Sequence, residues 1–106
     1  MLTLPIKKKW FDMILKGEKR EEYREIKPYY DKRFKNVMRS LECVYYKEDN
    51  GCPTFFVELR NGYSRSSLYI IAKVTLSIGC GRPEWGAEPN KEYYVLVIKE
   101  IISCKA

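Results

Sequence analysis

The segment after the first helical pattern of the chain concentrates charged side chains at regular spacing. Lys19, Glu22 and Arg24 lie within six residues, and Arg20 stands between them. Lysine and arginine attract an anion, and a carboxylate between two arginines stays ionised, which suits Glu22 to orienting its neighbours better than to acting as a general acid. We therefore expect an anion-binding site here, in which Lys19 and Glu22 would move protons if the protein is an enzyme.

Gly17 decides whether these side chains can meet. A glycine at this point ends a helix in the left-handed C-cap conformation. On a regular strand, Arg20, Glu22 and Arg24 would share one face, and Lys19 would point to the other. A site therefore requires the turn after Gly17 to redirect Lys19. The alternative is a ladder of exposed ion pairs, which would contribute little to stability.

Further basic and aromatic residues extend the candidate site. Lys7, Lys8 and Lys9 fall in the first turn of a predicted helix, where free backbone N–H groups would attract the same anion. The sequence leaves open which of them reaches a cleft, and solvated lysines are the alternative. Trp85, in a loop rich in glycine and proline, would stack on a base or plug the end of a barrel. Tyr29 and Tyr30 have two similar alternatives, stacking on a base or packing beneath a helix.

Hydrophobic periodicity and turn signals give the elements that must position these residues. Helices are expected at about 7–16, with Trp10, Ile14 and Phe11 inward, and at 28–39. Strands are expected at 2–6, 19–26, 41–46, 54–59, 68–78 and 93–102, with a hairpin at Asn50-Gly51. This order predicts a single α+β domain, residues 1–106, whose sheet curls into a barrel.

The distribution of charge along the chain indicates which classes of partner to expect. Residues 1–39 hold 12 Lys/Arg against 6 Asp/Glu, so the whole formal charge of +6 falls in the first third of the chain. Such asymmetry favours nucleic acid, a nucleotide or an anionic lipid, with a solubilising surface as the alternative. No apolar run reaches the roughly 18 residues of a membrane span, so we expect a cytoplasmic protein with no membrane partner.

The cysteine and histidine counts bear on metals and disulfides. The chain has four cysteines without C-x-x-C spacing and no histidine, so we expect neither a metal site nor a cofactor. Without a secretory signal, four free thiols are expected in a reducing cytoplasm, and two disulfides are the alternative.

The run Gly17-x-Lys19-x-x-Glu22-x-Arg24 resembles the G-x-K-x-x-E-x-R signature of ASCH domains, which are relatives of PUA domains. The stretch around Trp85 is also similar to the phage and bacterial branch of that family. The resemblance covers most of the chain and is weaker between about residues 40 and 75. It implies a PUA-like mixed β-barrel of five to six strands with two or three helices, and a cleft between the first helix and the barrel.

The resemblance also implies a function. Family members are proposed to bind RNA in that cleft, and some act as small hydrolases or nucleases. Carried over residue by residue, the cleft would hold Lys19, Glu22 and Arg24, with Gly17 shaping the turn. We expect RNA or nucleotide binding, and the alternative is hydrolysis of a modified nucleoside or of RNA by Lys19 and Glu22. A protein-interaction domain ranks last, because the predicted core leaves no apolar stripe uncovered.

Overall fold

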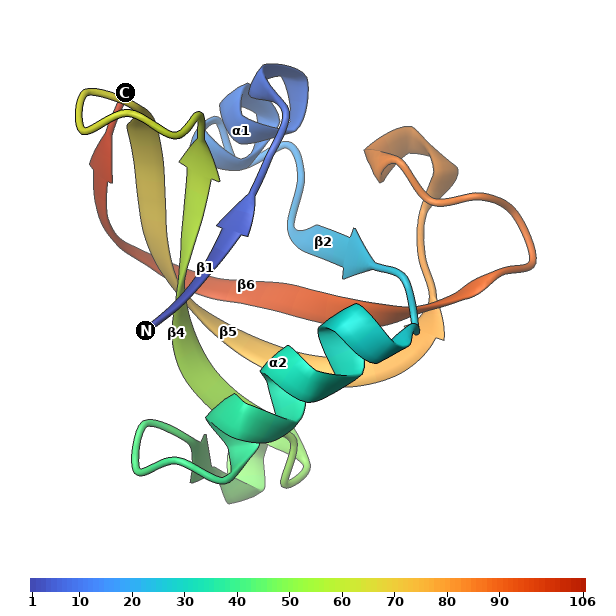
Figure 1. Ribbon diagram of the computed structural model, residues 1–106. Helices are drawn as coiled ribbons and strands as arrows, with labels where there is room; N and C mark the ends of the chain where they lie inside the picture. Colours follow the sequence, from blue (N-terminus) through green and yellow to red (C-terminus); the bar gives the residue numbers. More distant parts are fainter.

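One curled sheet with two helices packed against it makes up the protein (Figure 1). The computed structural model describes residues 1–106. The sheet runs in the order β1-β4-β5-β6-β2, with β3 paired to β4; β1 and β4 are parallel and all other pairs antiparallel. The strands are β1 (Leu2–Pro5), β2 (Glu21–Arg24), β3 (Val44–Tyr45), β4 (Pro53–Asn61), β5 (Leu68–Cys80) and β6 (Glu92–Lys105). The predicted α+β fold with a mixed, barrel-like sheet is confirmed.

The helices begin and end within one residue of their predicted limits. They are α1 (Lys8–Leu15) and α2 (Pro28–Met38), and two short 3₁₀ turns, η1 (Lys47–Asp49) and η2 (Pro83–Trp85), interrupt the loops. Pro28 occupies the first turn of α2, where its missing N–H costs nothing. On α1, Phe11 and Ile14 are buried, whereas Trp10 is only half-buried and lies at the edge of the apolar face.

The curled sheet does not close into a complete barrel. β1 and β2 are the two ends of the strand order, and no strand pairing joins them. We call the gap between these two strands the seam. Arg24 of β2 bridges it, because its Nη2 donates to the carbonyl oxygen of Pro5 at the end of β1, 2.6 Å away. A side chain of β2 thus contacts β1 across the seam, where no backbone hydrogen bonds pair the two strands.

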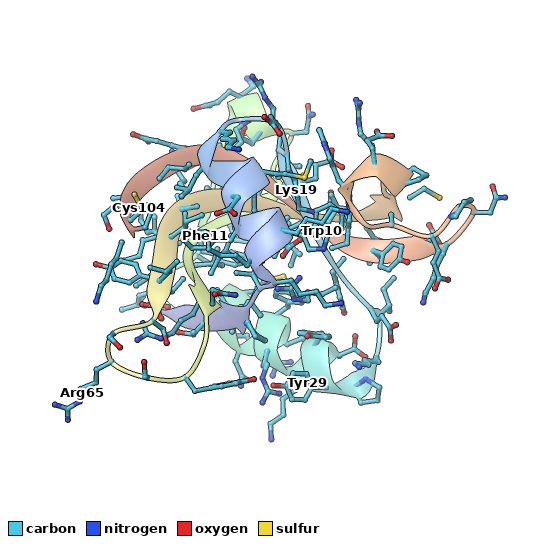
Figure 2. The ribbon with its side chains drawn as sticks, turned by 90° about the horizontal axis from the view of Figure 1, so that it is seen from above. Trp10, Phe11, Lys19, Tyr29, Arg65 and Cys104 are labelled. Atoms are coloured by element: carbon cyan, nitrogen blue, oxygen red, sulfur yellow. The ribbon has the colours of Figure 1, made fainter.

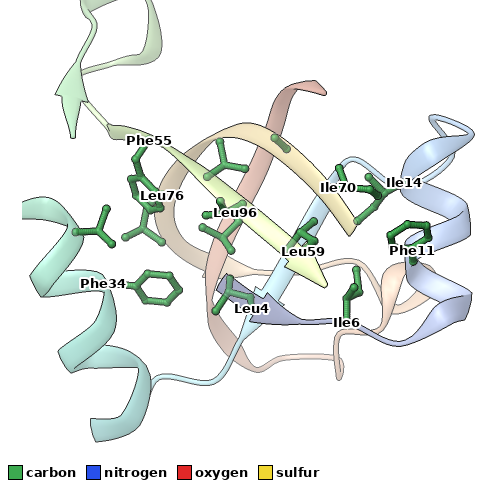
Figure 3. Close-up of a cluster of buried hydrophobic side chains, with 14 residues drawn as sticks. Leu4, Ile6, Phe11, Ile14, Phe34, Phe55, Leu59, Ile70, Leu76 and Leu96 are labelled. Carbon is green, nitrogen blue, oxygen red and sulfur yellow. The ribbon is translucent and has the colours of Figure 1, made fainter. Parts of the chain in front are cut away.

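The core lies between the sheet and the two helices (Figure 3). Phe34 from α2 and Phe11 from α1 are fully buried against strand residues such as Leu59 and Leu96. Each such side chain contributes roughly 1.5–3 kcal/mol by leaving water. A second, smaller cluster lies beneath the loop after β5 and is built on Tyr23 and Tyr93. The two clusters fix α1, α2 and that loop around the seam.

Some expectations for residues 40–106 need correction. Strand β3 covers only Val44–Tyr45, although the predicted hairpin with β4 does form. β6 continues to Lys105, beyond the predicted end at 102, because it pairs with β5 as far as Tyr69. These differences change the lengths of strands and leave their order along the chain intact.

The expectation that no apolar surface is left uncovered is wrong. Strand alternation turns Phe56 and Ile71 away from the core, since both of their neighbours on each strand point inward. They line an open hollow of about 610 Å³ together with Leu41, which is fully exposed. The chain therefore carries an exposed apolar patch on its outer side.

Three further structural facts concern the other sequence expectations. Neither helix has the length and hydropathy that a membrane-crossing segment needs. Each of the four cysteines is a free thiol. No group of three or more His, Cys, Asp and Glu side chains is placed to hold a metal ion.

Candidate functional site

The turn after α1 brings Lys19 to the seam. Gly17 has φ +76°, which glycine adopts without strain. The N–H of Gly17 donates to Ile14 O at 3.1 Å and that of Glu18 to Met13 O at 2.9 Å, the two hydrogen bonds of a Schellman motif. The N–H of Lys19 also donates to Met13 O, at 3.1 Å. Because Lys19 precedes β2, strand alternation does not hold it on the opposite face.

The ammonium of Lys19 is enclosed by its partners. The residue is 1% exposed. Its Nζ lies 3.0 Å from Glu22 Oε1 and donates to the carbonyl oxygen of Trp85. The ring centroids of Trp10 and Tyr23 lie 4.7 and 5.0 Å from the same atom. A carboxylate, a carbonyl and two aromatic faces therefore surround the three N–H donors of this group.

Glu22 links Lys19 to Arg24. Its second oxygen, Oε2, lies 3.0 Å from Arg24 Nη1, and the glutamate is 4% exposed. Arg24 Nη1 also donates to Tyr23 O at 2.8 Å, and Nη2 makes the seam contact with Pro5. No buried polar side-chain atom lacks a hydrogen-bond partner. We call Lys19, Glu22 and Arg24 the triad; it carries one net positive charge in a mostly buried place.

Burial changes the acid–base behaviour of one member of the triad. Removal from water disfavours the charged form and lowers the pKa of Lys19, and Arg24 adds to this effect. The carboxylate of Glu22 acts in the opposite direction but does not cancel the shift. Lys19 therefore gives up its proton more readily than an exposed lysine.

A pocket of about 260 Å³ opens at the seam, beside the triad. Four aromatic residues line it, Trp10 from α1, Tyr23 from β2, Tyr30 from α2 and Trp85 from η2. Arg24 and Lys7 contribute cationic groups. We call this hollow the seam pocket. Lys19 does not line it, so the triad presents Arg24 and Glu22 to the pocket and keeps Lys19 behind them.

The structure separates the three lysines at the start of α1. Lys7 lines the seam pocket. Lys8 forms an exposed ion pair with Asp12 on the same helix. Lys9 lies over the ring of Trp10, with Nζ 4.6 Å from the centroid. Of the three, Lys7 is the one that a ligand in the pocket meets.

Arg20 is not brought into the triad. It is exposed and makes no ion pair, and its carbonyl oxygen accepts a hydrogen bond from Ile98 N at 2.8 Å. Arg20 was expected to share a strand face with Glu22 and Arg24. It does not, because β2 begins only at Glu21. Arg20 thus lies at the entry to the strand and points to solvent.

Trp85 sits on a loop that is docked onto α1. Its side chain is half-buried and lines the seam pocket, with Arg82 Cζ 4.8 Å from its ring centroid. Gly86 follows at φ +102°, and a Cβ there would lie 3.0 Å from Cζ2 of Trp10. Figure 2 shows Trp10 and Lys19 on the side of α1 toward this loop, with Phe11 on the other side. The loop is thus a wall of the pocket, and its position depends on Trp10.

Sequence reasoning missed two contributors to the site. Trp10 was assigned to the core through its spacing with Ile14; it does pack against the core, but it is also a wall of the seam pocket. The carbonyl oxygens of Pro5 and Trp85, which bind Arg24 and Lys19, leave no signal in a sequence. The one hint of the role of Trp10 was a large aromatic residue directly after three lysines, at the edge of an apolar helix face.

Comparisons with protein-family models, with curated proteins and with solved structures find no match to this chain. Membership of the ASCH family therefore stays a prediction that rests on the motif. What the fold and site define is an α+β protein with an open seam, an aromatic-walled cationic pocket and a buried ion triad behind it.

Proposed function

We propose that this protein binds single-stranded RNA and holds one nucleotide in the seam pocket. The observation that carries the proposal is the combination of Trp10, Tyr30 and Trp85 with the cations Lys7 and Arg24 around one hollow. A base stacked on an aromatic ring gains about 1–3 kcal/mol, and a nearby cation attracts its phosphate. The motif that resembles ASCH domains supports the same function.

The size of the seam pocket favours an unpaired nucleotide over a duplex. Its volume of about 260 Å³ is just under the roughly 300 Å³ at which ligand pockets begin. Sequence-reading RNA modules take single-stranded bases that are splayed out and stacked on aromatic side chains. A single base with its phosphate is therefore the ligand that fits both the volume and the chemistry of the walls.

The triad has a positioning role in this proposal. Glu22 and the Pro5 carbonyl fix the guanidinium of Arg24, and Lys19 fixes the loop through the Trp85 carbonyl. Fixed groups bind more tightly because less side-chain freedom is lost on binding. Arg24 and Lys7 then contact the ligand, while Lys19 and Glu22 hold the pocket in shape.

Fluorescence anisotropy with a labelled single-stranded RNA tests the proposal. Trp85→Ala should weaken binding about tenfold or more, because one stacking surface is lost. Tyr63→Ala is the matched control, since Tyr63 is an exposed aromatic residue that does not line the seam pocket. Binding should also weaken steeply with salt. Flat, negligible binding to RNA and DNA at low salt would refute the proposal.

The hydrolase alternative has one supporting observation, the lowered pKa of Lys19. A lysine needs such a shift to act as a base or nucleophile near neutral pH. Its Nζ is occupied by Glu22 and the Trp85 carbonyl, however, and Lys19 does not line the pocket. Incubation with acylated cytidines and with labelled RNA tests this reading. Product formation that survives Lys19→Ala would exclude Lys19 as the catalytic group.

A further inference from the structure

We propose that α2 carries a second RNA contact, a phosphate-binding surface for the strand that leaves the seam pocket. We call this surface the α2 track; it consists of Lys32, Lys35 and Arg39. The inference rests on the proposed function and extends it, because it specifies a ligand of several nucleotides. Nothing in the G-x-K-x-x-E-x-R motif includes these residues.

The three cations converge on one hollow. Their spacing of three and four residues places them on the same side of the helix. Together with Pro28, Asp31 and Asn36 they line a hollow of about 450 Å³ that contains no hydrophobic residue. Lys32, Lys35 and Arg39 are all exposed. The surface is therefore an open polar groove to which three long basic side chains contribute.

No carboxylate neutralises the α2 track. None of the three track residues makes an ion pair, in contrast to Lys8 and Lys99, which pair with Asp12 and Asp49. Other exposed cations, such as Lys47 and Arg65, are unpaired too, and what sets the track apart is that its three cations share one hollow. The only acidic residue at the hollow, Asp31, accepts a hydrogen bond from the Tyr94 hydroxyl of β6. Three cations thus face one carboxylate at this hollow, which keeps a net positive charge.

The position of these cations is not explained by helix stability. Like charges three or four residues apart cost a few tenths of a kcal/mol in a helix. The helix dipole offsets this cost only near the C-terminal end, so it favours Arg39 but not Lys32, which lies in the first half of α2. An anionic ligand removes the repulsion, which makes a phosphate chain the complementary partner.

The α2 track and the seam pocket lie on different sides of one helix. Tyr30, which lines the pocket, stands two residues before Lys32, a rotation of about 200° around the helix axis, so a strand that leaves the pocket must cross α2 to reach the track. From Pro28 to Arg39 the helix rises about 16 Å at 1.5 Å per residue. One nucleotide cannot span both sites, so the ligand is a strand. The hollow has no apolar residue to insert into a bilayer, which favours RNA over an anionic membrane.

Two charge-matched triple variants test the inference. The first is Lys32→Gln, Lys35→Gln, Arg39→Gln. The control is Lys47→Gln, Arg65→Gln, Lys105→Gln, which removes three exposed, unpaired cations elsewhere. With a 12-nucleotide single-stranded RNA, the α2 variant should lose about tenfold or more in affinity at low salt, and its salt slope should fall by about 2. Binding of uridine monophosphate, followed by tryptophan fluorescence, should stay unchanged in both.

The outcomes separate this inference from the proposed function. Equal RNA affinities and salt slopes for the two triple variants, with a clear loss in Trp85→Ala, would overturn the α2 track and leave the seam pocket standing. Absence of any RNA or nucleotide binding by the wild-type protein would overturn both. An α2 variant that loses affinity for phosphatidylserine vesicles but not for RNA would also overturn the inference, in favour of a membrane partner.

Discussion

Lys19 shows how much a single buried charge depends on its neighbours. Its ammonium lies 3.0 Å from Glu22 and is almost fully buried. Lys19→Met should lower the free energy of unfolding by about 3–5 kcal/mol, because it leaves the carboxylate short of a partner. Urea unfolding measures the loss. Lys8→Met, which breaks the exposed pair with Asp12, is the control and should cost at most about 1 kcal/mol. Equal losses in the two variants would contradict a buried pair.

Tyr94 gives the second prediction at the scale of single residues. Its hydroxyl donates to Asp31, and this hydrogen bond raises the pKa of Tyr94 to about 12. The unfolded chain releases the proton near pH 10, so the stabilisation is complete below pH 10 and is lost between pH 10 and 12. Tyr94→Phe should lower the free energy of unfolding at neutral pH by about 1 kcal/mol. It should also make this free energy fall less steeply between pH 10 and 12.

Urea unfolding at several pH values measures the effect of Tyr94→Phe. Tyr63→Phe is the control, since Tyr63 is 96% exposed. A Tyr94→Phe protein whose stability falls between pH 10 and 12 as steeply as the wild type would show that another group is responsible.

Among the elements, the end of α1 is the one on which the site depends most directly. Gly17→Ala should destabilise the protein by about 1–2 kcal/mol, because an L-residue with a Cβ is strained at φ +76°. A Cβ at this position meets no atom within 4 Å, so the cost is in the backbone alone. Thermal unfolding measures it. Gly79→Ala, equally open but without positive φ, should change stability little, and similar losses in both would contradict the capping role.

The seam between β1 and β2 gives a prediction about local opening. Arg24 Nη2 holds the Pro5 carbonyl across a gap that has no strand pairing. Arg24→Gln should therefore increase amide hydrogen exchange in β1 and β2, while central β5 keeps its protection, because local opening follows lost contacts. Exchange followed by mass spectrometry or NMR tests this. Unchanged protection in β1 and β2 would mean that the bridge is not needed to hold the seam.

At the scale of the whole molecule, local patterns predicted the elements and a sheet that curls, but not that the sheet stays open at the seam. Helix limits follow from periodicity and from caps such as Gly17 and Pro28, which act over a few residues. The open seam depends on long-range pairing, including two register shifts between β5 and β6, next to Ile71 and Lys73, that no local pattern marks. The outward Phe56 was missed for the same reason, since the face of a strand depends on its register.

The candidate site was predictable to a similar degree. On a strand, the spacing predicted a shared face for Glu22 and Arg24 but set Lys19 apart. The resemblance to the ASCH signature carried the expectation that the three converge, and their distances show that they meet. Which of the three residues lines the pocket and which lies behind it was not predictable, because this depends on burial. Lys19 lies behind the pocket, where its partners include the Trp85 carbonyl, a backbone group that is invisible in side-chain patterns.

The central claim, that RNA occupies the seam pocket, has a direct spectroscopic test. The chain contains two tryptophans, Trp10 and Trp85, and both line this pocket. In an NMR titration of ¹⁵N-labelled protein with single-stranded RNA, both indole N–H signals should shift and should saturate together with binding measured by anisotropy. RNA that binds while both indole signals stay unchanged would contradict the claim, since the ligand would then lie elsewhere on the protein.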